Sequence, residues 1–144
     1  MVYDNRKPGK IEVKAQRAVG KTFTPEIVDS SILETFPYEY PHRGVDVVHM
    51  TNEFTCVCPF SGLPDFAELI IAYVPNKKCI ELKSLKYYLY SYRQVKIFNE
   101  HVVNKILDDL VNVSKPRKMT VTGKFTTRGG ISTTVSAEYN GKKK

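Results

Sequence analysis

Two kinds of hydrophobic spacing alternate along this chain. Residues 45–58 (VDVVHMTNEFTCVC) and 66–75 (FAELIIAYVP) are rich in β-branched and aromatic residues with partial alternation, which is typical of β-strands. A Gly/Pro-containing loop separates them, so we expect two adjacent antiparallel strands. Residues 117–139 alternate again, break at Gly129-Gly130 and resume, which predicts a closing hairpin.

Between these strand pairs, apolar residues recur at three- and four-residue steps. The steps run through residues 81–93 and again through residues 100–113, which predicts two amphipathic helices. The element order β-β-α-α-β-β favours an α+β fold with a four-stranded antiparallel sheet and both helices on one face. Closure into a barrel with further copies of the chain removes the exposed sheet edges, so we expect a homo-oligomer.

The first forty residues lack this periodicity. They mix Lys, Glu, Pro and Thr, so we predict a partly irregular N-terminal arm over residues 1–40, with a short helix after Pro25, and a single domain over residues 41–144. No stretch approaches the roughly 18 consecutive apolar residues of a membrane span, and the first residues form no apolar signal region. We therefore expect a cytoplasmic protein without membrane contact.

Charge and composition narrow the chemistry. The net charge of +7, from 22 Lys and Arg against 15 Asp and Glu, favours an anionic partner such as a nucleic acid or a phosphorylated cofactor. No G-x-G-x-x-G or G-x-x-x-x-G-K-[ST] occurs, so a nucleotide would not be held by a Rossmann or Walker loop. Arg128-Gly129-Gly130 can approach a phosphate closely, although an ordinary hairpin turn explains these residues equally well.

Candidate catalytic groups gather in residues 55–66 (TCVCPFSGLPDF). Three cysteines, an odd number, argue against a disulfide framework. Cys56 suits a core position, whereas Cys58 ends the predicted strand and enters a loop whose N–H groups can favour a thiolate. Asp65 follows seven residues later, beyond prolines that exclude a helix, so its approach to Cys58 would depend on the loop, and a capping role stays open.

A metal site is a weaker interpretation of the same residues. Cys56 and Cys58 are two residues apart, and three histidines are available to complete a ligand set. The spacing matches poorly the gaps of structural zinc sites. We therefore predict no metal.

Residues 79–94 (CIELKSLKYYLYSYRQ) resemble the signature of the QueF family, the NADPH-dependent 7-cyano-7-deazaguanine reductases of queuosine biosynthesis. The resemblance runs from residue 54 to residue 139 and includes CPFSGLPDFA, FNEHVVNKILDDL and GKFTTRGGIS in the expected order. It implies the tunnelling fold, in which ββααββ units assemble into barrels with active sites between subunits. The length resembles the single-module type, whose pentamer rings stack in pairs, so the resemblance implies a decamer.

The resemblance also implies a mechanism and a set of site residues. Cys58 matches the nucleophile that adds to the substrate nitrile and forms a thioimide, and Asp65 matches the proton donor to its nitrogen. Reduction of a nitrile to an amine takes four electrons, hence two NADPH in turn. Substrate contacts are implied for Ile80, Glu81, Leu82, Asn99 and Glu100, and NADPH contacts for Leu82, Lys83, Arg128 and Gly129. Many members have His where this chain has Asn99, and whether His101 substitutes for it is open.

Two other functions remain open. A related amidinotransferase on the same fold acts on 7-cyano-7-deazaguanine already in tRNA and would use Cys58 and Asp65 without NADPH. Its relatives lack the Glu-x-Lys-x-x-Lys signature that is complete here at residues 81–86. A non-catalytic RNA-binding module would use tyrosines for stacking, but Tyr88 and Tyr92 share a helical face with leucines, which favours packing. We therefore expect no direct contact with nucleic acid. A protective bond between Cys56 and Cys58 is a further open question.

Overall fold

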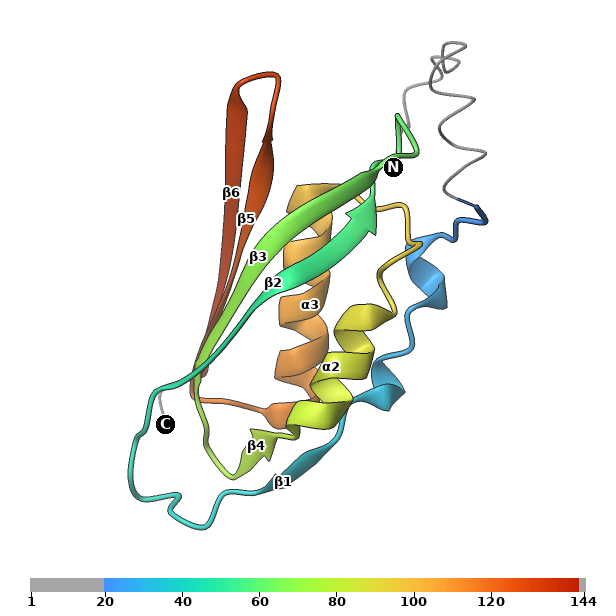
Figure 1. Ribbon diagram of the computed structural model, residues 1–144. Coiled ribbons are helices and arrows are strands. Elements are labelled where there is room, and N and C mark those ends of the chain that lie inside the picture. Colours follow the sequence, from blue (N-terminus) through green and yellow to red (C-terminus); the bar gives the residue numbers. More distant parts are fainter. Residues whose placement is uncertain (1–19, 143–144) are drawn as a thin grey trace.

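The computed structural model describes residues 20–142 of the 144-residue chain (Figure 1). Residues 1–19, most of the first half of the predicted arm, lie outside the described residues, as do residues 143–144. The elements are η1 (Pro25–Ile27), η2 (Ser30–Ile32), β1 (Thr35–Pro37), β2 (Val47–Val57), β3 (Pro64–Val74), β4 (Lys78–Ile80), α2 (Leu82–Tyr90), α3 (Asn99–Ser114), β5 (Lys118–Arg128) and β6 (Ile131–Asn140).

The main sheet is antiparallel and has four strands in the order β2-β3-β5-β6. Both α-helices cover one face of it (Figure 1), as the hydrophobic spacing predicted. Alternate residues of β3, namely Ala67, Leu69, Ile71 and Tyr73, are buried beneath the helices. No helix or strand among residues 20–142 covers the opposite face of the sheet (Figure 1). The predicted α+β arrangement is therefore confirmed for the sheet and its two helices.

A close approach of α3 to β5 depends on one glycine. A Cβ atom added at Gly123 would lie 3.0 Å from a methyl group of Val103 on α3 and 2.9 Å from the ring of Phe125. Both contacts are shorter than side chains normally tolerate. Gly123 therefore lets α3 pack directly on the sheet.

A second, two-stranded sheet pairs β1 with β4, and the hydrophobic pattern did not predict it. The N–H of Ile80, the last residue of β4, donates to the Tyr73 hydroxyl at 2.9 Å, which ties this small sheet to β3. Val28 and Leu33, both within the predicted arm, are buried in the core. Residues 20–40 therefore pack against the domain.

Half of residues 55–66 lie in strands, although their content of Gly and Pro indicated a loop. Strand β2 continues through Val57 and β3 begins at Pro64, so the connection spans residues 58–63 only. Asp65 lies in β3 and pairs with Cys56. The second strand therefore begins two residues earlier than predicted, and Asp65 lies in it, so the capping role that was left open for Asp65 is wrong. The reason is that a proline at the first position of a strand removes no hydrogen bond that the sheet needs.

Candidate active site

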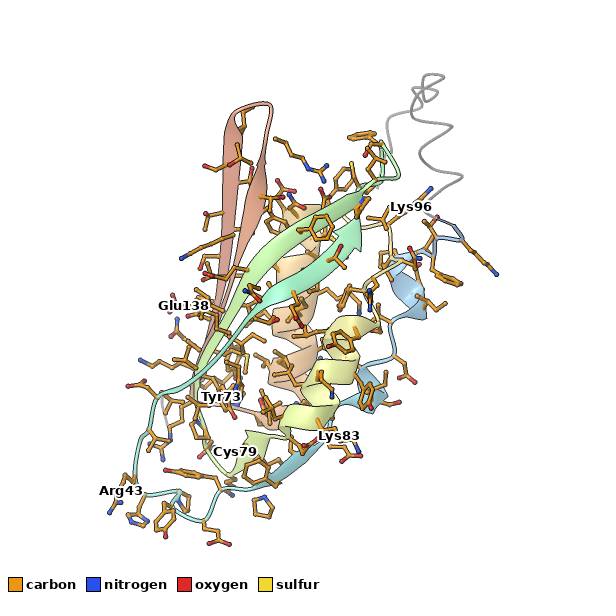
Figure 2. All side chains as sticks on the ribbon, in the orientation of Figure 1. Arg43, Tyr73, Cys79, Lys83, Lys96 and Glu138 are labelled. Atoms are coloured by element: carbon orange, nitrogen blue, oxygen red, sulfur yellow. The ribbon has the colours of Figure 1, made fainter. Side chains whose placement is uncertain are left out.

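The candidate residues fall into two groups at opposite ends of the sheet. The first group, here called the cysteine end, comprises Cys58, Asp65, Asn99, Glu100, Arg128 and Gly129. It lies where β2 and β5 end and where β3 and α3 begin (Figure 1). The second group, here called the signature end, comprises Ile80, Glu81, Leu82 and Lys83, at the junction of β4 and α2. Figure 2 shows Lys83 near one end of the molecule and Lys96, which pairs with Val57, near the other.

The backbone before Cys58 is fixed by a segment that leads directly into α3. The N–H of Val57 donates to the Val95 carbonyl at 2.9 Å, and the Ile97 N–H donates to the Val57 carbonyl at 3.1 Å. These bonds form a parallel bridge beside the end of β2. Because α3 begins at Asn99, the bridge holds the candidate nucleophile and the first turn of α3 in one rigid frame.

The backbone of Cys58 itself closes a tight turn. Its N–H donates to the Leu63 carbonyl at 2.8 Å, and its carbonyl accepts from the Gly62 N–H at 2.9 Å. Gly62 has a φ of 68°, a left-handed conformation that glycine adopts without strain. The turn satisfies the backbone of Cys58 and leaves its thiol partly exposed to solvent.

Asp65 lies beside this turn in a largely buried position. Its side chain is 10% exposed and forms an ion pair with the Arg128 guanidinium. Burial raises the pKa of the Asp65 carboxyl, and the charge and hydrogen bond of Arg128 lower it; the effect of burial is larger, so the pKa lies above its usual value. A carboxyl group of this kind retains a proton at higher pH than an exposed aspartate does, which suits a proton donor.

The neighbouring thiol, Cys56, has a different environment. It is fully buried, and burial, followed by the charges of Asp65 and Cys58, raises the pKa of the Cys56 thiol to about 12. It is therefore a neutral core residue near pH 7, as its composition-based interpretation predicted. All three cysteines are free thiols. Within residues 20–142, no three His, Cys, Asp or Glu side chains gather in an arrangement that could hold a metal ion.

The first turn of α3 presents polar groups to the cysteine end. The Oδ1 atom of Asn99 is buried and has no hydrogen-bond partner among the described residues. A buried acceptor without a donor is costly, so this oxygen is suited to receive an N–H group from a ligand. Glu100 is exposed in the same turn, where the helix N-terminus favours negative charge. His101 is also exposed and packs edge-on against the Phe98 ring.

At the signature end, Glu81 caps helix α2. Its carboxylate accepts from the backbone N–H groups of Lys83 at 2.8 Å and of Ser84 at 2.7 Å. These hydrogen bonds lower the pKa of Glu81. The backbone of Glu81 is paired as well, because its N–H donates to the Glu34 carbonyl at 2.9 Å and its carbonyl accepts from the Leu85 N–H at 3.1 Å. Lys83 and Leu82 are exposed beside it.

An apolar groove runs between β2 and α2, with a volume of about 170 Å³. Its lining includes Leu85 and Leu89 from α2 and His49 from β2. The Nε2 atom of His49 is buried without a hydrogen-bond partner among the described residues, and burial lowers the pKa of the imidazole. Neither Cys58 nor Asp65 lines this groove. The groove therefore does not join the two candidate groups within one copy.

A buried polar cluster joins the two helices, and the hydrophobic pattern did not predict it. The hydroxyl of Tyr88 donates to Asp109 Oδ2 on α3 at 2.6 Å and lies 2.9 Å from the hydroxyl of Tyr92. Asp109 also forms an ion pair with Lys105 at 3.1 Å. Tyr88 and Tyr92 are fully buried, which confirms that they pack in the core and are not available for stacking on RNA bases.

Comparison with known proteins identifies the family. A family model described as "QueF-like protein" matches residues 64–144. The chain is 52% identical over 122 residues to the NADPH-dependent 7-cyano-7-deazaguanine reductase of Thermoanaerobacter pseudethanolicus, a match that covers 85% of this chain and 92% of that protein. The chain belongs to the QueF family. A second QueF-family relative, the reductase of the same name from Caldicellulosiruptor bescii, is 56% identical over 114 residues, covering 79% of this chain and 87% of that protein.

A solved structure supports the fold of this QueF-family chain. The archaeosine synthase QueF-Like in its apo form aligns with a TM-score of 0.60 at 25% sequence identity. The alignment covers 69% of this chain and 96% of that chain. The identity to the two reductases is therefore about twice the identity to this synthase.

None of the helices in the part of the chain that the structure describes is long and apolar enough to span a membrane.

Proposed function

We propose that this chain is an NADPH-dependent 7-cyano-7-deazaguanine reductase of queuosine biosynthesis, which produces 7-aminomethyl-7-deazaguanine. The observation that carries this proposal is its 52% and 56% identity, over most of its length, to two reductases of that name. The cysteine end supplies chemistry that the reaction needs. The thiol of Cys58 is partly exposed, and Asp65, whose pKa is raised by burial, follows just after the connection of residues 58–63 that Cys58 begins.

The chain's own residues act first in this mechanism. The Cys58 thiolate adds to the nitrile carbon, so that an S–C bond forms and one C≡N π bond breaks. Asp65 donates a proton to the nitrile nitrogen, which leaves a neutral thioimide on Cys58 and a carboxylate on Asp65. NADPH supplies the hydride, and two molecules are needed in turn because the reduction takes four electrons. The covalent bond to Cys58 retains the substrate through the first reduction, and loss of the Cys58 thiolate then breaks the S–C bond and gives the imine that accepts the second hydride and a proton.

The residues present fit both the substrate and the cofactor phosphates. Asn99 offers its unpaired buried oxygen and Glu100 its carboxylate to the N–H groups of the deazaguanine ring. Such a site rejects rings that lack these donors, because a buried acceptor would remain unpaired. The exposed side chains of Lys83 and Arg128 are suitable cationic partners for the phosphates of NADPH, and Gly129 permits close backbone approach.

We place each active site between two copies of the chain. The cysteine end and the signature end lie at opposite ends of one copy, so a site that uses both takes Ile80, Glu81 and Leu82 from a neighbour. Among residues 20–142, β2 and β6 are the outer strands of this sheet, and each pairs with another of its strands on one side only; the other edge of β2 has a bridge from Val57 to Lys96. The uncovered sheet face exposes Val48, Met50 and Phe66, at 59%, 67% and 50%. These features support closure into a barrel, which we propose to be a stacked pair of pentamers.

The similarity to the archaeosine synthase QueF-Like favours one alternative, an amidinotransferase that acts on the same base in tRNA. That enzyme would share the Cys58 and Asp65 chemistry without NADPH. A gel-shift assay with unmodified tRNA distinguishes the two functions. The reductase requires no tRNA binding, whereas the amidinotransferase does.

The covalent step can be tested without NADPH. Wild-type protein is incubated with 7-cyano-7-deazaguanine and analysed by intact-protein mass spectrometry. We expect one substrate mass per chain, lost in Cys58→Ala and retained in Cys79→Ala, the matched control, because Cys79 lies in β4 and its thiol forms no bond to the substrate in the proposed mechanism. An adduct that persists in Cys58→Ala contradicts the proposed nucleophile.

A further inference from the structure

The side chain of Arg128 is paired within the fold and is also partly exposed to solvent. Its Nη2 atom contacts the Asp65 carboxylate and donates to the Pro64 carbonyl at 2.6 Å. The side chain as a whole is 47% exposed to solvent. The residue ends β5, and the turn that follows has φ values of 55° at Gly129 and 75° at Gly130; a Cβ atom added at either glycine would meet no atom within 4 Å. An anion from solvent can therefore reach the same group that now pairs with Asp65.

Of the groups around Asp65, Arg128 is the one whose positive charge a bound anion would neutralise. From β5, Arg128 stabilises the carboxylate. From β2, the register partner Cys56 is a neutral thiol, and Cys58 follows in the turn. The first turn of α3 places Asn99, Glu100 and His101 at the same end of the sheet. A phosphate at Arg128 would neutralise the nearby positive charge and add a negative one, and both effects disfavour an ionised Asp65.

We propose that Arg128 is a positioning residue that couples occupancy of the cofactor phosphate site to the protonation of Asp65. This inference rests on the proposed function, because it takes NADPH as the anion. In the free protein the charge of Arg128 favours the ionised form of Asp65 and so opposes the effect of burial. When a phosphate of the cofactor binds Arg128, this opposition weakens, so the protonated fraction of Asp65 increases by uptake of protons from solvent while Arg128 keeps its charge. Each hydride transfer to carbon also needs a proton at nitrogen. Binding of NADPH, the hydride donor, would therefore also favour protonation of Asp65, the acid that donates this proton.

The coupling predicts that cofactor binding takes up protons. NADP⁺ is the probe, because it carries the phosphates and cannot reduce the substrate. Isothermal titration calorimetry in buffers of different ionisation enthalpy measures the number of protons exchanged per site. We expect net uptake by the wild type, with a lower or negative value in Asp65→Asn. A phosphate that binds a cation tends to release protons, so uptake cannot come from the ligand itself.

Two variants complete the test. Arg128→Gln should bind NADP⁺ at least about fivefold more weakly and lose the Asp65-dependent uptake. Lys124→Gln removes a cation from the same strand, where Lys124 pairs with Glu68 at 3.6 Å, and should keep the wild-type uptake. Equal proton exchange in wild type and Asp65→Asn, or full uptake in Arg128→Gln, overturns the coupling while the proposed function stands. Failure of the wild type to bind NADP⁺ refutes the proposed cofactor, and the coupling with it.

Discussion

Replacing Asp65 by Asn separates the chemical role of this side chain from its structural one. The two side chains have nearly the same shape, so the packing of a residue that is 10% exposed is preserved. The substitution removes the ion pair with Arg128, which is half exposed and therefore screened by solvent, at a cost of about 0–1 kcal/mol. It also removes the desolvation of a buried carboxylate, which acts in the opposite direction.

The expected effect on stability is therefore small and the expected effect on chemistry is large. The free energy of unfolding should change by no more than about 1 kcal/mol, which shifts the Tm by no more than about 4 °C. A general acid contributes about 10²–10⁴-fold to a rate. The rate constant for adduct formation at Cys58 should fall by at least about 100-fold in Asp65→Asn, a loss of about 2.7 kcal/mol of transition-state stabilisation.

Rapid quenching followed by intact-protein mass spectrometry measures this rate constant over a range of pH, without NADPH. Burial raises the pKa of Asp65, so the carboxyl group loses its proton at higher pH than an ordinary aspartate does. The Asp65-dependent part of the wild-type rate therefore declines as pH rises through this raised pKa, and it is absent in Asp65→Asn. A variant rate within about threefold of wild type, with the same pH profile, would refute the assignment of Asp65 as the acid.

Three further substitutions test the packing and the recognition site. Gly123→Ala should lower the free energy of unfolding by about 1–3 kcal/mol in urea, because its Cβ meets Val103 at 3.0 Å; wild-type stability would mean that α3 does not pack this closely. Tyr88→Phe should cost about 1.5–3 kcal/mol by removing the hydrogen bond to Asp109, whereas Tyr87→Phe, at an exposed position, should cost nothing measurable; equal effects would contradict the buried network. Asn99→Leu should raise the KM for the substrate at least about fivefold, and an unchanged KM would show that its oxygen receives no substrate donor.

The regular elements could be predicted from the sequence because burial alternates with the period of each element. The predicted helix over residues 100–113 is α3, Asn99–Ser114, and the predicted hairpin closes at Gly129-Gly130 as expected. The helix predicted over residues 81–93 ends earlier, at Tyr90. Residues 91–94 form turns that bring Val95 beside the end of β2. A local hydrophobic pattern contains no information about such a contact between distant residues.

The parts of the site that could not be predicted depend on contacts between distant positions. Strands β1 and β4 have three residues each, too few to produce a periodic signal, and Thr35 pairs with Ile80 across 45 positions. The ion pair between Asp65 and Arg128 joins the start of β3 to the end of β5. Neither residue type nor spacing indicates such a pair. The resemblance to the QueF family supplied the candidate residues, but only the fold separates them into two ends.

The most direct test of the proposed function is the stoichiometry of NADPH oxidation by the purified protein with 7-cyano-7-deazaguanine. The product amine is quantified by mass spectrometry, and Cys58→Ala is measured in parallel. The proposed mechanism predicts two NADPH oxidised for each amine formed and no oxidation by Cys58→Ala. A Cys58-dependent adduct without any NADPH oxidation would contradict the reductase and leave the nitrile chemistry to the tRNA amidinotransferase alternative.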